Sequence, residues 1–526
     1  MAGDDWRGWV LYQVYPRSFQ DTTGDGIGDL RGITARLDHV ASLGVDGVWL
    51  SPFYPSPMAD FGYDVADYRG VDPMFGTLAD FDALAARAHA LGLKVVIDQV
   101  WCHTSDRHPW FQSSRLDRAG DRADWYVWAD AKADGTPPSN WQSVFGGPAW
   151  TWDARRGQYY MHNFLSAQPQ LNLHHRPVQD ALLDVARFWL DRGVDGFRLD
   201  ALNFAMHDPA LTDNPAEAPG RGVWPRTRPF DFQQHRHNQS QPGMMAFVEQ
   251  VRALTDSDGG RFTVAEIPGA DSGAERRAYV APGRLNTAYG FDFLYAPDLT
   301  AARVHAAMAQ WPEDAGWPAW AFCNHDAPRA VSRWAPEADR DAAARMALML
   351  LLCLRGVVFL YQGEELGLPQ AAVPFERLAD PEAIANWPHT LGRDGARTPM
   401  PWTTDTPWAG FSTVEPWLPV DPRHPPLSVD AQDGDPDSIL NLARRLIALR
   451  KGREALRTGA YRPVDAPEPL IAFERGDAES RLLCVFNPTA APVPWSLPEG
   501  WGLVAGGGGV APSLAPYGAW VAEWIA

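Results

Sequence analysis

Cysteine is scarce in this chain of 526 residues, which has only four, at Cys102, Cys323, Cys353 and Cys484. They lie far apart and form no CxxC pair, which excludes a disulfide framework and a cysteine-based zinc site. The first ten residues, MAGDDWRGWV, have no apolar core of the kind that marks a signal peptide. Both observations predict a protein of the reducing cytoplasm.

Long hydrophobic runs and an excess of positive charge are also lacking. The longest apolar stretch, residues 346–361, is interrupted by Arg355 and Gly356 and is too short to cross a bilayer. Acidic residues outnumber basic ones, 65 to 46, and the net charge of −19 disfavours binding to phosphate backbones and anionic lipids. We therefore expect neither a nucleic-acid partner nor a membrane partner.

Aromatic residues are plentiful, with 24 Trp, 23 Phe and 14 Tyr. Planar side chains of this kind stack on sugar rings, although most of the tryptophans are expected in the core. The chain is longer than one hydrophobic core usually holds, so one large domain with smaller satellites is expected.

Short buried-strand patterns alternate with amphipathic helical patterns along most of the chain. The helical patterns include residues 78–91, 178–192 and 342–354. The strand patterns are residues 10–19, 45–52, 93–100, 194–199, 262–267, 287–293, 317–323 and 357–361. Strand–helix alternation predicts an α/β fold with a parallel sheet, and eight strands over this length predict a closed (β/α)8 TIM barrel.

Departures from even spacing predict the domain organisation. Residues 104–172 are rich in Trp, Gly, Pro and Asp and are interpreted as a subdomain inserted after the third strand. Residues 367–417 form a smaller insertion after the eighth strand, and residues 438–457 a closing helix. The barrel then comprises residues 1–103 and 173–457. The alternating pattern of residues 458–526 predicts a C-terminal antiparallel β-domain.

Ionisable side chains gather at the predicted strand ends. Because barrel active sites form at the carboxyl ends of the strands, these residues are candidates for one shared site. They are Asp98 and His103 after the third strand, Arg198 and Asp200 on the fourth, Glu266 on the fifth, and His325 and Asp326 after the seventh.

Glycosidic bond hydrolysis needs two carboxyl groups in different protonation states. Arg198 and Asp200 are two residues apart on a strand, so they point to the same side, and the cation favours an ionised Asp200. Glu266 follows the apolar run 262–265, and partial burial would raise its pKa and keep it protonated as an acid. Each acid taken alone could instead cap the next helix.

The ordered set resembles glycoside hydrolase family 13, the α-amylase family. The resemblance covers nearly the whole chain and rests on residues 98–103 (DQVWCH), 170–173 (QLNL), 196–203 (GFRLDALN), 265–267 (AEI) and 322–326 (FCNHD). It implies a double displacement with Asp200 as nucleophile and Glu266 as general acid/base. Asp326 would complete the triad and stabilise the transition state. A retaining enzyme is also expected to hold the Asp200 and Glu266 carboxyls about 5–5.5 Å apart.

Within that family the chain resembles the bacterial α-glucosidase and oligo-1,6-glucosidase branch, through residues 9–19, 60–65 and 392–402. The resemblance implies a pocket closed at the non-reducing end, and therefore release of one glucose at a time. Arg393 or Arg397 should pair with Asp60 to close it, and Arg393 is favoured. The implied substrate-binding residues are Asp60, Tyr63, His103, Phe164, Arg198, His325, Arg393 and Arg397. Phe145 also resembles a residue that lines the entrance, with the core of the inserted subdomain as the alternative, and Trp224 is expected on the leaving-group side.

Two positions bear on the details. Gln99 and Trp101-Cys102 stand where many family members have an asparagine that serves a metal in the inserted subdomain, so a metal there is not expected. Ala201 follows the nucleophile where members that prefer α-1,6 links commonly carry Val. It therefore favours α-1,4 substrates such as maltose.

A separate loop predicts a structural cation. Asp21, Thr23, Asp25, Ile27 and Asp29 alternate along it, like the first part of an EF-hand loop, and the family branch carries a divalent cation there. Ca²⁺ is favoured over Mg²⁺, because carbonyl and carboxylate ligands of mixed type tolerate irregular geometry. The alternative is a polar turn held by its Asp side chains. No organic cofactor is expected.

Other functions within the family stay open at this point. The same catalytic residues would serve a transglucosylase or an enzyme acting on sucrose or trehalose, since only the acceptor differs. A non-catalytic relative that serves as a binding or transporter-partner protein would lose catalytic acids, and all three are present. The expected ligands are short oligosaccharides and other α-glucosides, and both a monomer and a homodimer are compatible with the sequence.

Overall fold

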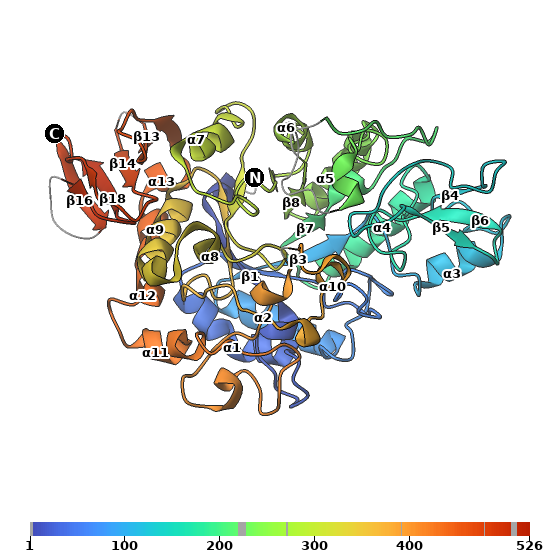
Figure 1. The fold of residues 1–526 in the computed structure, drawn as a ribbon, viewed down its shortest axis with the longest axis horizontal. Helices are drawn as coiled ribbons and strands as arrows, with labels where there is room; N and C mark the ends of the chain where they lie inside the picture. Colours follow the sequence, from blue (N-terminus) through green and yellow to red (C-terminus); the bar gives the residue numbers. More distant parts are fainter. Residues whose placement is uncertain are drawn as a thin grey trace.

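The computed structural model describes residues 4–218, 228–269, 272–390, 392–477, 479–506 and 513–525. In these residues eight parallel strands form one sheet at the centre of the molecule (Figure 1). The strands are β1 (Val10–Val14), β2 (Gly47–Leu50), β3 (Lys94–Val100), β7 (Gly196–Asp200), β8 (Phe262–Glu266), β9 (Thr287–Tyr289), β10 (Ala319–Ala321) and β11 (Val357–Tyr361).

The order of pairing closes this sheet into a barrel. Neighbouring strands run β10-β11-β1-β2-β3-β7-β8-β9, and a parallel bridge between Ala288 and Pro318 joins β9 to the start of β10. The predicted (β/α)8 barrel is therefore confirmed. Since all eight strands are parallel, their carboxyl ends share one rim.

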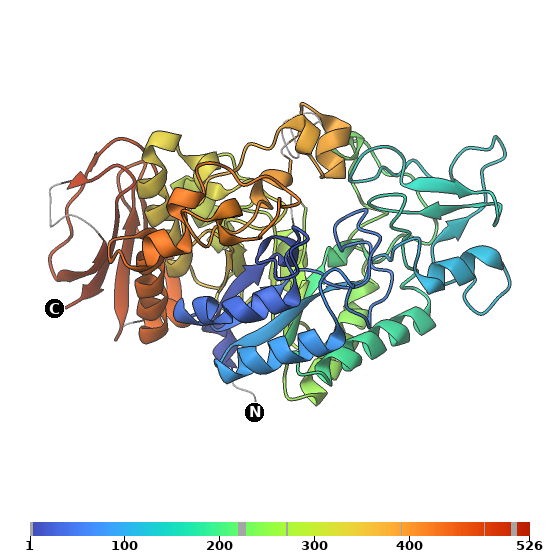
Figure 2. The ribbon, with the colours of Figure 1, turned by 90° about the horizontal axis from the view of Figure 1, so that it is seen from below.

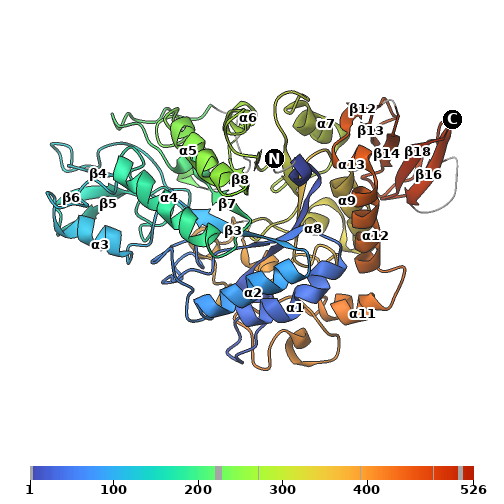
Figure 3. The same ribbon diagram turned by 180° about the vertical axis from the view of Figure 1, so that it is seen from behind.

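Helices cover the outside of the barrel, and Figure 3 shows α1, α2, α4 and α5 around one half of it. Those that follow the strands are α1 (Leu30–Ser42), α2 (Leu78–Ala90), α4 (Arg176–Leu190), α5 (Met244–Ser257), α6 (Gly273–Tyr279), α7 (Ala301–Ala309), α8 (Ala330–Trp334), α9 (Arg340–Cys353) and α12 (Ile439–Gly452). Local sequence explains where several begin. Thr77 and Asp80 form a capping box for α2, and the side chain of Ser438 caps α12.

Side chains fill the barrel interior. Leu11, Trp49, Val96, Val264 and Phe359 belong to one buried cluster, with at most 1% of each exposed. Gly196 allows β7 to lie close to β8, because a Cβ atom there would be 2.4 Å from the carbonyl oxygen of Phe262. The barrel is thus a packed core, and chemistry is confined to its rim.

Two sets of smaller strands lie outside the barrel, at opposite ends of the molecule in Figure 1. Between β3 and α4 the chain carries α3 (Pro109–Leu116) and an antiparallel sheet of order β4-β6-β5: β4 (Trp128–Ala129), β6 (Gln158–Met161) and β5 (Trp150–Asp153). The C-terminal antiparallel sheet has the order β12-β13-β14-β18-β16: β12 (Ala460–Pro463), β13 (Ile471–Gly476), β14 (Arg481–Phe486), β18 (Ala519–Trp524) and β16 (Trp501–Gly506). A separate pair joins β15 (Val493–Pro494) and β17 (Ser513–Leu514).

Some element ends differ from the sequence predictions. The strand predicted over residues 10–19 ends at Val14, because Pro16 begins a 3₁₀ turn. The closing helix predicted over residues 438–457 is divided into α12 and α13 (Glu454–Arg457), since Arg453 adopts an extended conformation. The insertion after β11 contains α10 (Pro381–Asn386), and α11 (Val429–Asp433) follows it.

All four cysteines lie among the described residues, where each is buried and none is paired in a disulfide. No helix in the described part of the chain is both long and apolar enough to cross a membrane.

Candidate active site

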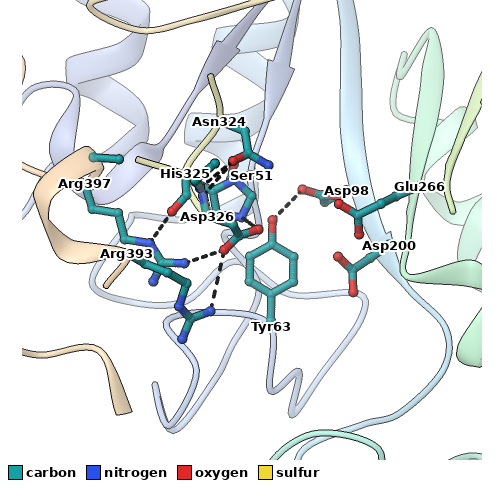
Figure 4. Close-up of polar contacts among 12 residues, drawn as sticks. Ser51, Tyr63, Asp98, Asp200, Glu266, Asn324, His325, Asp326, Arg393 and Arg397 are labelled. Atoms are coloured by element: carbon teal, nitrogen blue, oxygen red, sulfur yellow. Dashed lines mark hydrogen bonds and ion pairs between the residues drawn. The ribbon is translucent and has the colours of Figure 1, made fainter. Parts of the chain in front are cut away.

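Adjacent barrel strands bring the predicted acids together at the rim. Asp98 on β3 lies beside Arg198 on β7 in the register of the parallel ladder, and Glu266 ends β8. Asp200 ends β7, two residues after Arg198, so both side chains point to the same side. Figure 4 shows Asp98, Asp200 and Glu266 grouped on one side of the Tyr63 ring.

The guanidinium of Arg198 is the centre of this group. It bonds to the carboxyl groups of Asp98 at 2.7 Å, Asp200 at 2.5 Å and Glu266 at 2.6 Å. It also donates to the Tyr289 hydroxyl at 2.9 Å and 3.1 Å. Its side chain is fully buried, so water does not screen these contacts.

Burial makes two carboxyl groups of this cluster, those of Asp98 and Asp200, hold their protons more tightly. It raises the pKa of Asp200 well above its usual range and that of Asp98 to about 6, although Arg198 opposes both shifts. Arg198 therefore lies beside Asp200 as predicted, but burial has the larger effect on the pKa of Asp200. Asp98 and Asp200 share this one guanidinium, and the charge of Asp98 also raises the pKa of Asp200.

Glu266 is buried, as expected, but its surroundings are more polar than the apolar run before it suggested. Its Oε1 accepts a hydrogen bond from Tyr289 at 3.0 Å, and its Oε2 accepts one from the backbone N–H of Ala201 at 3.1 Å. Ala201 adopts the left-handed conformation, with φ of 39°. Because of this strained conformation, the N–H of Ala201, the residue directly after Asp200, points at the Glu266 carboxyl group and links the two acids.

Asp326 forms a second centre opposite the first (Figure 4). Arg397 bonds to its Oδ1 at 2.8 Å, and Arg393 lies 3.6 Å from the same atom. Burial opposes its ionisation, but His325 and the two arginines hold the pKa of Asp326 well below its usual value. Burial also lowers the pKa of His325 to about 3, so this ring is neutral at pH 7 and we assign the effect on Asp326 to the arginines.

The Asp60 side chain closes one end of the site. It is 6% exposed and accepts hydrogen bonds from Arg393 at 3.0 Å and from Gln168 at 3.0 Å. Burial raises its pKa against the effect of Arg393. The favoured pairing of Asp60 with Arg393 is therefore observed, while Arg397 bonds to Asp326 and to the carbonyl oxygen of His325.

Tyr63 lies between these two centres in Figure 4, and the other predicted binding residues join it through contacts with one another. Tyr63 stacks on His325, with ring centroids 5.2 Å apart, and donates to Asp98 at 3.0 Å. His103 donates from Nε2 to the Tyr63 carbonyl oxygen at 2.9 Å, and burial lowers its pKa to about 4. Phe164 packs against His103 and against Phe145. Trp224 lies outside the described residues.

In the loop at residues 21–29, where the sequence predicts a cation, the Asp side chains accept hydrogen bonds from the chain itself. Asp21 accepts hydrogen bonds from the N–H groups of Thr23, Gly24 and Gly26, and Asp29 caps α1. No three His, Cys, Asp or Glu side chains within the described ranges are placed to share one metal ion. A cation in this loop would thus depend on the Thr23 hydroxyl and the Ile27 carbonyl, together with carboxylates that already accept protein hydrogen bonds.

Two residues in the site were missed by the sequence reasoning. Tyr289 contacts both Arg198 and Glu266, and Gln168 joins Asp60 to His103, with nitrogen atoms of the Gln168 and His103 side chains 3.0 Å apart. Tyr289 is the last residue of β9, whereas the strand was predicted over residues 287–293, which placed Tyr289 inside the strand and away from the rim. Gln168 lies two residues before the motif at residues 170–173, which is the signal that could have indicated it.

Comparison with known proteins identifies the family. The sequence profile of the α-amylase catalytic domain matches residues 13–459. The chain belongs to glycoside hydrolase family 13. This glycoside hydrolase is 51% identical, over 92% of its length and 89% of the relative's, to a probable α-glucosidase of Rhizobium meliloti (strain 1021). It is 36% identical to an oligo-1,6-glucosidase of Heyndrickxia coagulans, over 95% of each chain.

A solved structure resembles this family 13 chain over nearly its whole length. The α-glucosyl transfer enzyme XgtA shares 50% sequence identity and superposes with a TM-score of 0.95, covering 99% of both chains. The α-glucosidase branch expected from the sequence is therefore shown.

Proposed function

We propose that this chain is a retaining, exo-acting α-glucosidase that hydrolyses terminal α-1,4 bonds of short substrates such as maltose. The observation that carries the proposal is the position of Asp200 and Glu266 on the two terminal nitrogens of one guanidinium. Two carboxyl groups bonded to one guanidinium can both reach the same glycosidic bond, as attack by one of them and protonation by the other require.

In the proposed reaction, a carboxylate oxygen of Asp200 attacks the anomeric carbon while Glu266 protonates the departing glycosidic oxygen. This forms a covalent β-glucosyl-enzyme and releases the aglycone. Glu266, now ionised, then takes a proton from water as the water attacks, which breaks the bond to Asp200 and releases α-glucose. Asp326, held ionised by Arg397, would bind sugar hydroxyls and stabilise the oxocarbenium-like transition state.

The exo-action follows from the Asp60–Arg393 ion pair. Its two side chains are 6% and 12% exposed, and they come from the segment after β2 and from the insertion after β11. A chain extending beyond the non-reducing glucose would have to displace both groups. We therefore propose that the pocket accepts a single glucosyl unit, with Asp60 and Arg393 bound to its far hydroxyls and Tyr63 stacked on its ring.

Product analysis tests this function. Wild type and Asp200→Asn are incubated separately with maltose, isomaltose, sucrose and trehalose, and the anomer released is followed by NMR. We expect wild type to release α-glucose, fastest from maltose, and the variant to be inactive. Initial release of β-glucose would exclude retention, faster turnover of isomaltose would overturn the linkage preference, and an active variant would exclude Asp200 as nucleophile.

Transglucosylation is the second candidate, favoured by the 50% identity to an α-glucosyl transfer enzyme. The chemistry on the enzyme is the same, and the second step uses a sugar hydroxyl in place of water. Accumulation of new disaccharides in the same product analysis would support this alternative.

For the loop at residues 21–29 we propose a structural divalent cation, Ca²⁺ in preference to Mg²⁺. The support is the alternation of oxygen-bearing groups along the loop, and elemental analysis of the purified protein tests it. For the cellular setting we propose the cytoplasm, consistent with four unpaired cysteines, and short α-glucosides as the ligands.

A further inference from the structure

Arg393 does not lie on a barrel strand, so something outside the barrel must hold it in the pocket. It belongs to the insertion after β11, whose helix α10 lies at the rim of the barrel (Figure 2, orange, at the top). An arginine side chain has several rotatable bonds and many rotamers, so its placement over Asp60 requires a partner that fixes it.

Asp380 is that partner. Its Oδ1 accepts hydrogen bonds from Nε of Arg393 at 3.0 Å and from Nη2 at 2.7 Å, and its Oδ2 accepts one from the backbone N–H of Arg393 at 2.9 Å. The Asp380 side chain is completely buried. Burial opposes its ionisation, but Arg393 holds the pKa of Asp380 below its usual value, so it is a carboxylate at neutral pH.

The segment that carries Asp380 is held in turn. Asp380 caps α10 by accepting from the N–H of Glu382 at 3.0 Å. The carboxylate of Asp394 accepts from the backbone N–H groups of Ala379 and Asp380, at 2.7 Å and 2.9 Å. The two ends of this segment therefore hold each other through reciprocal hydrogen bonds.

These contacts fix the side of the Arg393 guanidinium that carries Nε, and its two terminal nitrogens face the pocket. Nη2 bonds to both Asp380 and Asp60, and Nη1 faces Asp326 at 3.6 Å. We propose that Asp380 is a positioning residue: it fixes the Arg393 guanidinium so that the Asp60–Arg393 pair is formed before the glucosyl unit enters. This inference rests on the proposed function, because it assigns Asp380 to recognition of the non-reducing glucose.

The test separates this role from the capping of α10. In Asp380→Ser the hydroxyl can still cap the helix, but the counter-charge of Arg393 is lost. We expect KM for maltose to rise about tenfold or more, and kcat to change by less than about threefold, because the lost contact binds substrate and transition state alike. The inhibition constant of glucose, a competitive inhibitor, should rise by the same factor as KM.

A double-mutant cycle with Arg393→Ala shows whether Asp380 acts through Arg393. If it does, Asp380→Ser has almost no further effect on KM once Arg393 is removed. Asp380→Asn is the second variant if the serine protein does not fold. Asp421→Asn is the matched control: it is another buried carboxylate that bonds to an arginine, Arg423, and to backbone N–H groups, but it has no contact with Arg393, so KM is expected near wild type.

The inference would be overturned if Asp380→Ser raised KM by the same factor with and without Arg393. An unchanged KM in a folded Asp380→Ser protein would also overturn it. The proposed function fails by a different result, namely no hydrolysis of any α-glucoside by wild type.

Discussion

Arg198→Lys tests the electrostatic centre of the site, because lysine keeps the charge but replaces the planar fork of guanidinium donors by a single ammonium. Arg198 bonds to three carboxyl groups at 2.5–2.7 Å. Its Nη1 contacts Asp98 and Asp200, and its Nη2 contacts Glu266. One ammonium at the end of a straight chain cannot reach all three, so we expect at least two of the contacts to be lost.

The size of the effect follows from those contacts. A hydrogen bond to a charged group contributes about 1.5–3 kcal/mol, so two lost contacts amount to about 3–6 kcal/mol. If this energy stabilises the transition state, kcat/KM falls by about 10² to 10⁴. Because Arg198 lowers the pKa of Asp200 against burial, a weaker contact leaves the nucleophile protonated up to a higher pH. The acidic limb of the pH profile should therefore shift upward.

The assay is kcat/KM for p-nitrophenyl α-glucoside across the pH range in which both proteins remain folded. Arg450→Lys is the matched control: Arg450 is also fully buried but bonds to the carbonyl oxygens of Leu352 and Leu354, far from the rim. It should lower Tm without moving the pH profile. An Arg198→Lys enzyme within about tenfold of wild type, with an unshifted acidic limb, would refute the reasoning.

Three further predictions concern the neighbouring residues. Tyr289→Phe removes one donor to Glu266, which is expected to cost about 1.5–3 kcal/mol in the transition state and to lower kcat by about 10- to 200-fold; an unchanged kcat would contradict this. Ala201→Val puts a β-branched residue at a φ of 39°, so Tm should fall, and turnover of isomaltose relative to maltose should rise; an unchanged ratio would exclude a role in linkage preference. Chelation should lower Tm while leaving kcat unaltered if the loop at Asp21 holds a structural cation, and an unchanged Tm would count against it.

The barrel could be predicted because each of its strands is a short buried run between helical patterns. The exact ends of the strands and helices could not be predicted, since they depend on single residues such as Pro16 and on the extended backbone at Arg453. The alignment of Arg198 with Asp200 followed from the two-residue period of a strand. The net pKa of Asp200, on which Arg198 and burial have opposite effects, could not be predicted, because burial depends on elements distant in the sequence.

The contacts that sequence reasoning missed share one cause. Tyr289 and Asp380 are ordinary residues in their local sequence, and their partners Glu266 and Arg393 lie 23 and 13 residues away along the chain. Hydrogen bonds between separate elements leave no periodic pattern in the sequence. The choice of Arg393 over Arg397 as the partner of Asp60 was likewise only a preference, because one helical turn separates the two.

Trapping the covalent intermediate tests the central claim most directly. The enzyme is treated with 5-fluoro-α-glucosyl fluoride, which slows the second step more than the first, and the protein and its peptides are then analysed by mass spectrometry. We expect one fluoroglucosyl group per chain, attached to the peptide that contains Asp200 and absent from Asp200→Asn. A catalytically active enzyme that forms no adduct, or forms it on another residue, would contradict a double displacement through Asp200.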